Sequence, residues 1–530
     1  MEFELIAKTL QGLENVLAEE LTHLGANNIE IGRRMVAFTG DKEMMYRANI
    51  QLRTAIRILK PIMHFHAKTA DEVYDAVKSI DWTQYLTNRT TFAVDSVVYS
   101  SEFRHSKMVA YKVKDAIVDQ MREKTGDRPN IRLKNPDLQL HIHVAEYDCT
   151  LALDSSGESL HRRGYRAEQV EAPLNEVLAA GIILMTGWRG ECDFIDPMCG
   201  SGTFPIEAAL IARGISPGVF RSEFAFEKWS DFDRELFERV YNDDSDERPF
   251  NHHIYGYDIN VHAVAIATRN VKAAGLSKEI TIEQRDIKNF ETPAKPSILI
   301  TNPPYGERIS APDLLGLYKL IGTKLKHNFT DREAWILSYR EECFDEIGLK
   351  PSRRIPLYNG SLECELRKYQ IFSGKFNDMR AGGGDIKTRE DRRDMAQRKF
   401  KQHREFKERI GEQEEERPRR RFDDGEKPRR RFDDGEKPHR RFEDGERPRK
   451  RFDDNEKPRR RFDDDDRKPR RRFDDGEKPH RRFEDGERPR KRFDDDRRRP
   501  FDKDRKPRKN YDDKKPRGGN GRGLRFEHRD

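Results

Sequence analysis

Apolar and polar positions alternate between strand-like and helix-like spacing over the first 65 residues. The expected strands span residues 3–7, 29–31, 35–39 and 57–65. Between them, helices are expected over residues 13–24 and 42–52, and Gly25 ends the first helix. This order of elements predicts a small α+β domain of the ferredoxin-like kind.

The same alternation continues over residues 66–158 and predicts a second α+β domain. Its expected strands span residues 91–99, 138–145 and 150–154, and its expected helices cover residues 73–80 and 109–121. Basic residues gather near its edges: Arg104, His105, Lys107, Lys112, Lys114, Arg132 and Lys134. Such a stripe is more often a solvated surface than a binding surface, and only the rest of the chain favours RNA as its partner.

From residue 159 on, short apolar runs are typical of strands buried on both faces of a parallel sheet. These runs span residues 193–196, 254–259, 280–286, 297–301 and 334–339. Pro173 is expected to open a helix that runs to Thr186, and another is expected over residues 263–274. Asn359-Gly360, between strands expected over 355–358 and 362–372, is a strong hairpin signal, so the last strand should be antiparallel to its neighbour.

Composition changes abruptly after about residue 376. Charged residues make up 38 % of the 530 residues, and most of that excess lies in the region 385–530. A ten-residue unit repeats there, and the one that begins at Arg421 carries four positive charges, three negative charges and one Phe. One aromatic ring in each unit cannot build a core, so this tail is predicted to be disordered. The folded part is then about 375 residues, or two to three domains.

No stretch of the chain approaches the ~20 apolar residues of a membrane-spanning helix. The start, Met1-Glu2-Phe3-Glu4, lacks the basic and apolar regions of a signal peptide. The cysteines are scattered without metal-ligand spacing: Cys149, Cys192, Cys199, Cys343 and Cys364. We expect free thiols in a reducing cytosol and no bound metal.

An acidic residue ends the expected strand 193–196 and is followed by a glycine turn and an apolar helix, in the segment Asp-Pro-Met-Cys-Gly-Ser-Gly-Thr over 196–203. Gly200 and Gly202 would let the backbone approach a ligand, and the helix start would supply free N–H groups. No Gly-Lys-Ser/Thr follows, so a phosphate loop is excluded. A carboxylate beside such a turn suits a ligand that carries an ammonium group.

Two further acids lie at the ends of the next two expected strands. Asp258 is placed to accept hydrogen bonds from the two hydroxyls of a ribose, and Asp286 could accept one from an adenine amine. Either acid alone is more often a helix cap or a surface residue. Three acids after three successive strands favour a nucleotide-like ligand.

The segment Thr-Asn-Pro-Pro-Tyr-Gly over 301–306 begins at the last residue of the expected strand 297–301, and its two prolines end that strand. The side-chain oxygen of Asn302 and the carbonyl of Pro303 could accept both protons of a nucleobase amine. Tyr305 could stack on the base, a contact worth ~1–3 kcal/mol. The alternative is an Asn-Pro turn that only ends a strand.

These motifs resemble those of the S-adenosylmethionine-dependent RNA guanine-N2 methyltransferases that carry a THUMP domain, above all the bacterial 23S ribosomal RNA branch. The similarity covers residues 1 to about 375 and includes further segments at 160–166, 172–176, 226–229, 301–308 and 358–366. The resemblance implies a ferredoxin-like domain (1–65), a THUMP RNA-binding domain (66–158) and a Rossmann-like, seven-stranded α/β methyltransferase domain (159–376). The tail 385–530 lies outside it.

The resemblance also implies residue roles. The methionine end of the cofactor would be lined by Asp196, Pro197, Cys199, Gly200, Gly202 and Thr203. Asp258 would bind its ribose and Asp286 would face its adenine. The catalytic residues Asn302, Pro303 and Tyr305 would hold the target base, with Asn302 also beside the cofactor. The stretch from Asp196 to Asp258 is about three times the usual spacing between strands, and no second glycine loop follows residue 376, so one activity is expected.

The expected reaction is methyl transfer from S-adenosylmethionine to the exocyclic N2 amine of a guanine in 23S ribosomal RNA. Asn302 is neutral and cannot act as a strong base, so the amine proton should leave after the transfer. Three alternatives stay open: a transfer RNA guanine methyltransferase, a DNA adenine-N6 enzyme, and a non-catalytic ribosome-assembly or RNA-chaperone protein.

Truncation after about residue 384 should leave folding and cofactor binding intact while RNA affinity falls at low salt. The reason is that arginines of the tail can pair with phosphates and its phenylalanines can stack on unpaired bases. Loss of these contacts should make the slope of log affinity against log salt concentration shallower, by about 0.7 for each phosphate released on single strands. Equal RNA affinity and salt slope for the truncated and full chains would instead identify the tail as a solubilising polyampholyte.

Overall fold

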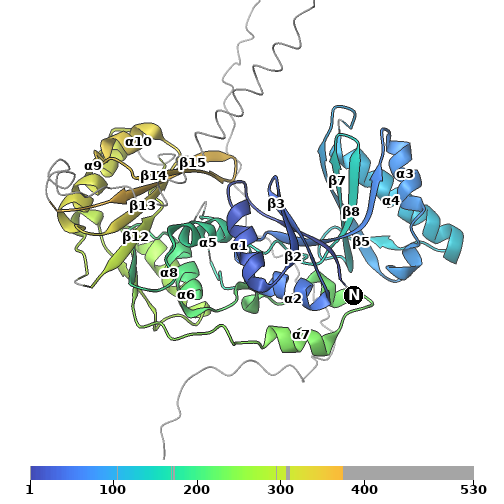
Figure 1. Ribbon diagram of the computed structural model, residues 1–530, viewed down its shortest axis with the longest axis horizontal. Helices are drawn as coiled ribbons and strands as arrows, with labels where there is room; N and C mark the ends of the chain where they lie inside the picture. Colours follow the sequence, from blue (N-terminus) through green and yellow to red (C-terminus); the bar gives the residue numbers. More distant parts are fainter. Residues whose placement is uncertain are drawn as a thin grey trace, which may run out of the picture. The chain divides into compact units, whose positions relative to one another are not determined.

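Two β-sheets organise the described part of the chain (Figure 1). The computed structural model describes residues 2–103, 105–168, 170, 173–293, 295–305 and 311–373. Some residues and segments of the sequence analysis lie outside these ranges: Arg104, Ala172, Gly306, Glu307, Arg308 and the tail 385–530.

The first sheet has eight strands in the order β2-β3-β1-β4-β8-β7-β5-β6. Their bounds are β1 Phe3–Lys8, β2 Asn27–Gly32, β3 Met35–Gly40, β4 Arg57–His66, β5 Thr91–Tyr99, β6 Asn130–Ile131, β7 Leu138–Ala145 and β8 Asp148–Asp154. Leu59 of β4 pairs with Ile6 on one side and with Asp154 on the other. Strand β4 therefore joins the ferredoxin-like region and the THUMP region into one continuous sheet, which the local sequence pattern did not indicate.

Four helices accompany this sheet: α1 Glu14–Leu24, α2 Lys42–Gln51, α3 Ala70–Lys78 and α4 Ser106–Thr125. Gly25 ends α1 as expected, with a left-handed φ of 84° and an N–H that bonds back to carbonyls of the last turn. Helix α4 places Val109, Val113 and Ile117 in the core, at the steps of four that predicted it. The expected α+β folds of this half of the chain are confirmed.

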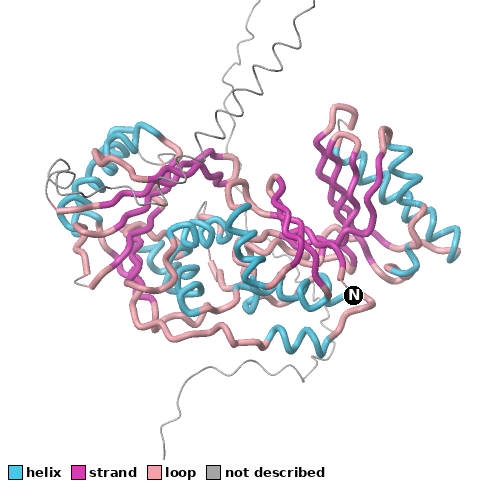
Figure 2. The backbone as a smooth tube through the Cα atoms, in the orientation of Figure 1, coloured by secondary structure: helices cyan, strands magenta, loops and turns pink. Residues whose placement is uncertain are grey.

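The second sheet has seven strands in the order β11-β10-β9-β12-β13-β15-β14. Their bounds are β9 Asp193–Asp196, β10 Ile254–Asp258, β11 Ile280–Gln284, β12 Ser297–Thr301, β13 Glu333–Ser338, β14 Arg353–Asn359 and β15 Leu362–Gln370. The five strands from β11 to β13 are parallel, and β15 is antiparallel to both of its neighbours. Figure 2 shows these strands in magenta among the helices. The Rossmann-like, seven-stranded fold is confirmed.

The helices of this region are α5 Glu176–Thr186, α6 Thr203–Arg213, α7 Arg234–Tyr241, α8 Val261–Ala273, α9 Ala311–Asn328 and α10 Glu341–Glu346. The expected helix start at Pro173 is wrong. Helix α5 begins at Glu176 because the side chain of Asn175 accepts hydrogen bonds from the N–H groups of Val177 and Leu178. Helices α7, α9 and α10 and the short strand β6 were not anticipated.

The expected third strand also ends earlier than its pattern indicated. Strand β11 stops at Gln284, so Asp286 does not end a strand. Its carboxylate instead accepts the N–H of Lys288 at 2.9 Å and caps a short 3₁₀ turn, Ile287–Asn289. Capping is a common role of Asp before a helical turn.

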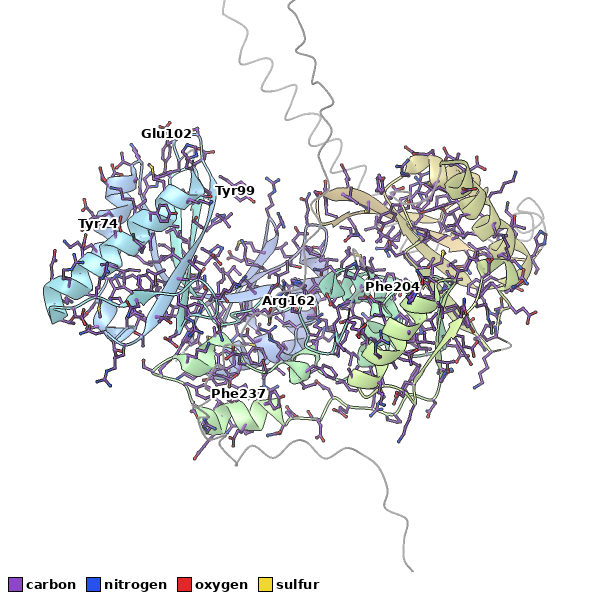
Figure 3. All side chains as sticks on the ribbon, turned by 180° about the vertical axis from the view of Figure 1, so that it is seen from behind. Tyr74, Tyr99, Glu102, Arg162, Phe204 and Phe237 are labelled. Carbon is purple, nitrogen blue, oxygen red and sulfur yellow. The ribbon has the colours of Figure 1, made fainter. Side chains whose placement is uncertain are left out.

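The long stretch between Asp196 and Asp258 contains an aromatic strap, which we define as residues 217–241. The ring of Phe226 stacks on Tyr46 of α2 at 4.4 Å, and the ring of Phe224 stacks on Phe226 at 5.2 Å. Phe237 of α7, labelled in Figure 3, meets Tyr46 edge-on at 6.0 Å. In sequence, the strap lies between strands β9 and β10 of the second sheet. Its aromatic rings nevertheless belong to the hydrophobic core of the first sheet. It therefore ties the two sheets together through packing.

Phe226→Ala should lower the free energy of unfolding by about 3–5 kcal/mol, because Phe226 is only 1 % exposed and its loss leaves a cavity between two aromatic rings. Chemical denaturation would measure the effect. Leu133→Ala is the matched control, since Leu133 is 82 % exposed and its substitution should change stability by less than about 0.5 kcal/mol. Equal effects of the two substitutions would contradict a structural role for the strap.

Candidate active site

A cavity of about 830 Å³ opens at the edge of the second sheet where its parallel strands end. Among its lining residues are the segments that follow β9, β10, β11 and β12: Asp196, Pro197, Cys199, Gly200, Thr203, Asp258, Asp286, Asn302, Pro303 and Tyr305. All residues singled out from the sequence for cofactor or base binding line this cavity, except Gly202. Its volume is typical of sites for small organic ligands.

The two central strands are joined at this edge by one buried hydrogen bond. Thr301, the last residue of β12, donates its hydroxyl to a carboxylate oxygen of Asp196, the last residue of β9, at 2.8 Å. The N–H of Met198 donates to the same oxygen at 3.2 Å. Asp196 is 1 % exposed, and this burial raises the pKa of its carboxyl group to about 7. A ligand with an ammonium group would supply the missing positive charge.

The glycine turn holds Asp258 in place. The N–H of Gly200 donates to one carboxylate oxygen of Asp258 at 3.0 Å, and the N–H of Asn260 donates to the other at 2.8 Å. The backbone of Cys199 also bonds to the carbonyl of Tyr257 at 2.8 Å. Asp258 therefore has a fixed orientation, and it remains partly exposed to the cavity, where its remaining lone pairs can accept hydroxyl donors.

The two glycines of the turn have different roles. A side chain at Gly200 would meet no atom within 4 Å, so its backbone can be approached freely from the cavity. A Cβ at Gly202 would lie 3.2 Å from the Cβ of Ala267 in α8. Gly202 does not line the cavity; it allows the start of α6 to pack closely against α8. The expected ligand contact at Gly202 thus has no support in the cavity geometry.

The Asn302-Pro303-Pro304-Tyr305 turn forms the wall beside Asp196. The hydroxyl of Tyr305 donates to the side-chain oxygen of Asn302, and the ring of Tyr305 meets that of Tyr339 edge-on at 5.3 Å. Burial raises the pKa of Tyr305, so the phenol keeps its proton and remains a donor. The acceptor expected to bind a base amine is therefore already hydrogen-bonded, and a base must displace the Tyr305 hydroxyl or share the oxygen with it.

Sequence reasoning missed several residues at the cavity. Thr301 stood in the quoted motif, but only the neighbouring positions of β9 and β12 bring it to Asp196. Arg285 lines the cavity, and its guanidinium lies 4.3 Å from the ring centroid of Tyr257. Asn359 also lines the cavity, from the hairpin whose Asn-Gly signal was read only as a turn. No local pattern distinguishes these residues from ordinary surface polar residues.

The ranges that the structure describes contain no group of three or more His, Cys, Asp or Glu side chains arranged to hold a metal ion. Within the same ranges, every helix is too short or too polar to cross a bilayer. Burial raises the pKa of Cys199 well above its usual value, so this thiol at the cavity wall stays neutral.

The donor and acceptor groups of the cavity fit a nucleoside that carries an amino acid. Asp258 offers carboxylate oxygens to hydroxyl groups, and Asp196, which directly precedes the glycine turn, can pair with an ammonium group. The start of α6 supplies N–H groups, and the backbone at Gly200 leaves room for the ligand. These are the groups needed by S-adenosylmethionine, which has a ribose, an ammonium and a carboxylate.

Comparison with protein families divides the chain into three matched segments. Residues 4–59 match a model described as the RlmL ferredoxin-like domain, residues 67–154 match the THUMP domain, and residues 163–368 match the RMKL-like methyltransferase domain. These matches agree with the resemblance inferred from the motifs.

Two curated relatives illustrate the similarity. A protein of Synechocystis sp., provisionally named as an RNA methyltransferase, is 37 % identical over 373 residues, which cover 69 % of this chain and 96 % of the relative. A ribosomal RNA large subunit methyltransferase K/L of Syntrophotalea carbinolica is 38 % identical over 387 residues, which cover 70 % of this chain and 54 % of the relative. The chain thus spans about half the length of the K/L relatives that it matches.

Solved structures match the described fold. The structure of the methyltransferase-like protein SMU.472 in complex with SAH, the demethylated cofactor, has a TM-score of 0.64 and is 31 % identical, covering 71 % of this chain and 99 % of that one. A protein of Listeria monocytogenes, described as a predicted N6-adenine-specific DNA methylase, has a TM-score of 0.63 and is 32 % identical, covering 70 % and 97 %. The cofactor bound in the first of these agrees with the donor set of the cavity, and S-adenosylmethionine is the cofactor of this fold.

Asp196→Asn should remove a pH dependence from the stability of the ligand-free protein. An aspartate in the unfolded chain has a pKa of about 4, whereas the buried Asp196 of the folded protein has a pKa of about 7. Between these values the folded state holds an extra proton, so stability should fall as pH rises, by roughly 3 kcal/mol between pH 5 and pH 8. Chemical denaturation at four pH values would measure this. Parallel profiles for the wild-type and Asn proteins would contradict the raised pKa.

Asp258→Ala should weaken binding of S-adenosylhomocysteine by about 1.5–3 kcal/mol, the range for hydrogen bonds to a charged group. The structural basis is the orientation of Asp258 by Gly200 and Asn260 at the cavity wall. Calorimetry on the full chain would give the affinity, and Asp286→Ala would show whether the capping acid contributes as well. An unchanged affinity in Asp258→Ala would remove this residue from the cofactor site.

Proposed function

The chain belongs to the family of THUMP-containing RNA methyltransferases that includes the K/L enzymes of the large ribosomal subunit, and from this premise we propose that it methylates the exocyclic N2 amine of a guanine in 23S ribosomal RNA. The observation that carries the proposal is the position of the Asn302 turn, beside Asp196 and in the same cavity as Asp258. A base amine and a cofactor can meet there.

S-adenosylmethionine supplies the electrophilic methyl group when bound. Asp196 and the glycine turn hold its amino acid end, and Asp258 holds its ribose. The side-chain oxygen of Asn302 and the carbonyl of Pro303 accept the two protons of the guanine amine, which turns its lone pair toward the methyl group. The protein contributes orientation and exclusion of water, and both lower the barrier to transfer.

Tyr305 connects base binding to the state of Asn302. In the described structure its hydroxyl occupies the side-chain oxygen of Asn302. An entering guanine replaces that donor with its own amine, and the freed Tyr305 can then pack on the base. Asn302 itself is neutral and cannot act as a strong base, so the amine proton is lost after the transfer.

We further propose a division of labour in which residues 1–65 and 66–158 bind RNA, while residues 159–376 carry the chemistry. Exposed apolar side chains support the THUMP region as the RNA surface: Tyr99 is 56 % exposed and Tyr111 is 60 % exposed. Lys114 lies 5.7 Å from the ring of Tyr111. Rings interleaved with cations suit unpaired bases and the backbone of RNA. Figure 3 labels Tyr99 at this surface.

The name of the Listeria protein suggests a second candidate function, which is adenine-N6 methylation of DNA. An Asn-Pro-Pro-Tyr turn can hold either amine. The THUMP match favours RNA over DNA, and the K/L relatives favour ribosomal RNA over transfer RNA.

The proposal is tested by methyl transfer from labelled S-adenosylmethionine into RNA purified from a strain that lacks the gene. Label should enter 23S ribosomal RNA and be absent from RNA of the parent strain, where the site is already modified. Mapping the labelled fragment would locate the nucleotide. Label entering only transfer RNA or only DNA would overturn the substrate assignment.

Asn302→Ala should reduce the methyl-transfer rate by roughly 10²–10³-fold while S-adenosylhomocysteine still binds with nearly wild-type affinity. This is the usual cost of removing one polar contact to a reacting group. Tyr305→Phe is the informative companion, because it removes the hydroxyl that occupies Asn302 and keeps the ring. Unchanged turnover in Asn302→Ala would exclude its catalytic role.

A further inference from the structure

The linker between the THUMP region and the second sheet is fixed to helix α6. We refer to residues 159–166 of this linker as the arm. Arg163 is buried and donates to Glu207 of α6, to the carbonyl of Leu160 and to the carbonyl of Arg53. The hydroxyl of Tyr165 donates to Glu207 at 2.9 Å. The arm is therefore held in one position relative to the helix whose first turn borders the cavity.

Arg166, the last residue of the arm, contacts the cavity wall directly. Its Nη1 donates to the hydroxyl oxygen of Ser201 at 2.7 Å, and its Nη2 donates to the hydroxyl oxygen of Thr203 at 3.0 Å. Its Nε donates to Glu176 at 2.7 Å, and the side chain is 14 % exposed. Arg166 itself does not line the cavity, whereas Ser201 and Thr203 both do.

These contacts determine what the two hydroxyls can do. A hydroxyl group has one proton to donate, and here each oxygen already accepts an N–H from a cation. The hydroxyl protons must therefore turn away from Arg166, and both residues line the cavity. Donation by a guanidinium also polarises each O–H bond and makes it a stronger donor.

The surroundings of this pair favour an anion. Thr203 is the first residue of α6, where the N–H groups of the first turn have no partner in the helix. The acids Asp196 and Asp258 lie at the other end of the glycine turn, bonded to Met198 and to Gly200. The wall thus presents carboxylates at one end of the turn and donors at the other. The amino acid end of S-adenosylmethionine carries an ammonium and a carboxylate and has the same polarity.

We propose that Arg166 is a positioning residue, which turns the hydroxyls of Ser201 and Thr203 toward the carboxylate of the cofactor's amino acid end. The inference rests on the assignment of this cavity as the cofactor site. Arg166 acts through the two hydroxyls and does not touch the cofactor. The description of the matched methyltransferase family assigns no role to this residue.

A purely structural role for Arg166 predicts a different outcome. If the arginine only anchored the arm, its loss would disturb the whole cavity and weaken every ligand alike. If it orients the two hydroxyls, only ligands with the carboxylate lose affinity. S-adenosylhomocysteine and 5′-methylthioadenosine separate these cases, because both contain adenosine and a thioether sulfur, but only the first has the amino acid end.

The experiment measures both affinities by calorimetry on the full chain. Arg166→Met should weaken the binding of S-adenosylhomocysteine by about 10- to 100-fold, the usual cost of losing hydrogen bonds to a charged group. The affinity for 5′-methylthioadenosine should stay within about twofold of the wild-type value. Arg162→Met is the matched control, because Arg162, labelled in Figure 3, stands in the same arm and is exposed. Its guanidinium pairs with Glu158, and neither residue lines the cavity. It should change neither affinity.

Three further variants keep the test independent of any folding defect in Arg166→Met. Ser201→Ala and Thr203→Val each remove one hydroxyl with little change of volume, and each should reproduce part of the selective loss. In Arg166→Lys the ammonium group can reach only one of the two hydroxyls. The affinity of this variant for S-adenosylhomocysteine should therefore lie between those of Arg166→Met and the wild type.

Equal losses for the two ligands, or no loss in Ser201→Ala and Thr203→Val, would overturn the role of Arg166 and leave the proposed function intact. Failure of the wild-type chain to bind S-adenosylhomocysteine would instead overturn the cofactor assignment and the proposed function with it.

Discussion

The hydrogen bond from Thr301 to Asp196 joins the two strands on which the whole site depends. These residues are 105 positions apart in the chain, yet they end neighbouring parallel strands. After β9 the chain builds the sheet outward through β10 and β11, and then returns to add β12 on the other side of β9. Loops that follow β9 and β12 must therefore diverge, and a cavity opens between them. The acids proposed to bind the cofactor come from one side of this division, and the turn proposed to bind the base comes from the other.

A second constraint is the attachment of this sheet to the half of the chain that we propose binds RNA. The strap places Phe226 and Phe237 in the core around Tyr46, and the arm places Arg163 between Arg53 and Glu207. Both links are buried, so they resist the local opening that an exposed linker would allow. An RNA held by the first sheet would therefore meet the cavity at a fixed distance.

Local patterns in the sequence were enough to locate most strands and the glycine turn, because buried parallel strands are short apolar runs and turns need Gly, Pro or Asn. They failed where structure depends on partners far along the chain. Strand β4 joins two regions because both of its edges are paired, which no local pattern encodes. The close packing of Gly202 against Ala267 was not anticipated, and the ligand contact expected at Gly202 stays a prediction. The bond between Tyr305 and Asn302 depends on how the turn folds back.

The identity of the methylated base is the most direct test of the proposed activity. Ribosomal RNA from a strain lacking the gene should be incubated with the full chain and S-adenosylmethionine, digested to nucleosides and analysed by mass spectrometry. The account predicts N2-methylguanosine as the new product, and predicts that it disappears in the Asn302→Ala variant. A new N6-methyladenosine, or the absence of any new methylated nucleoside, would contradict it.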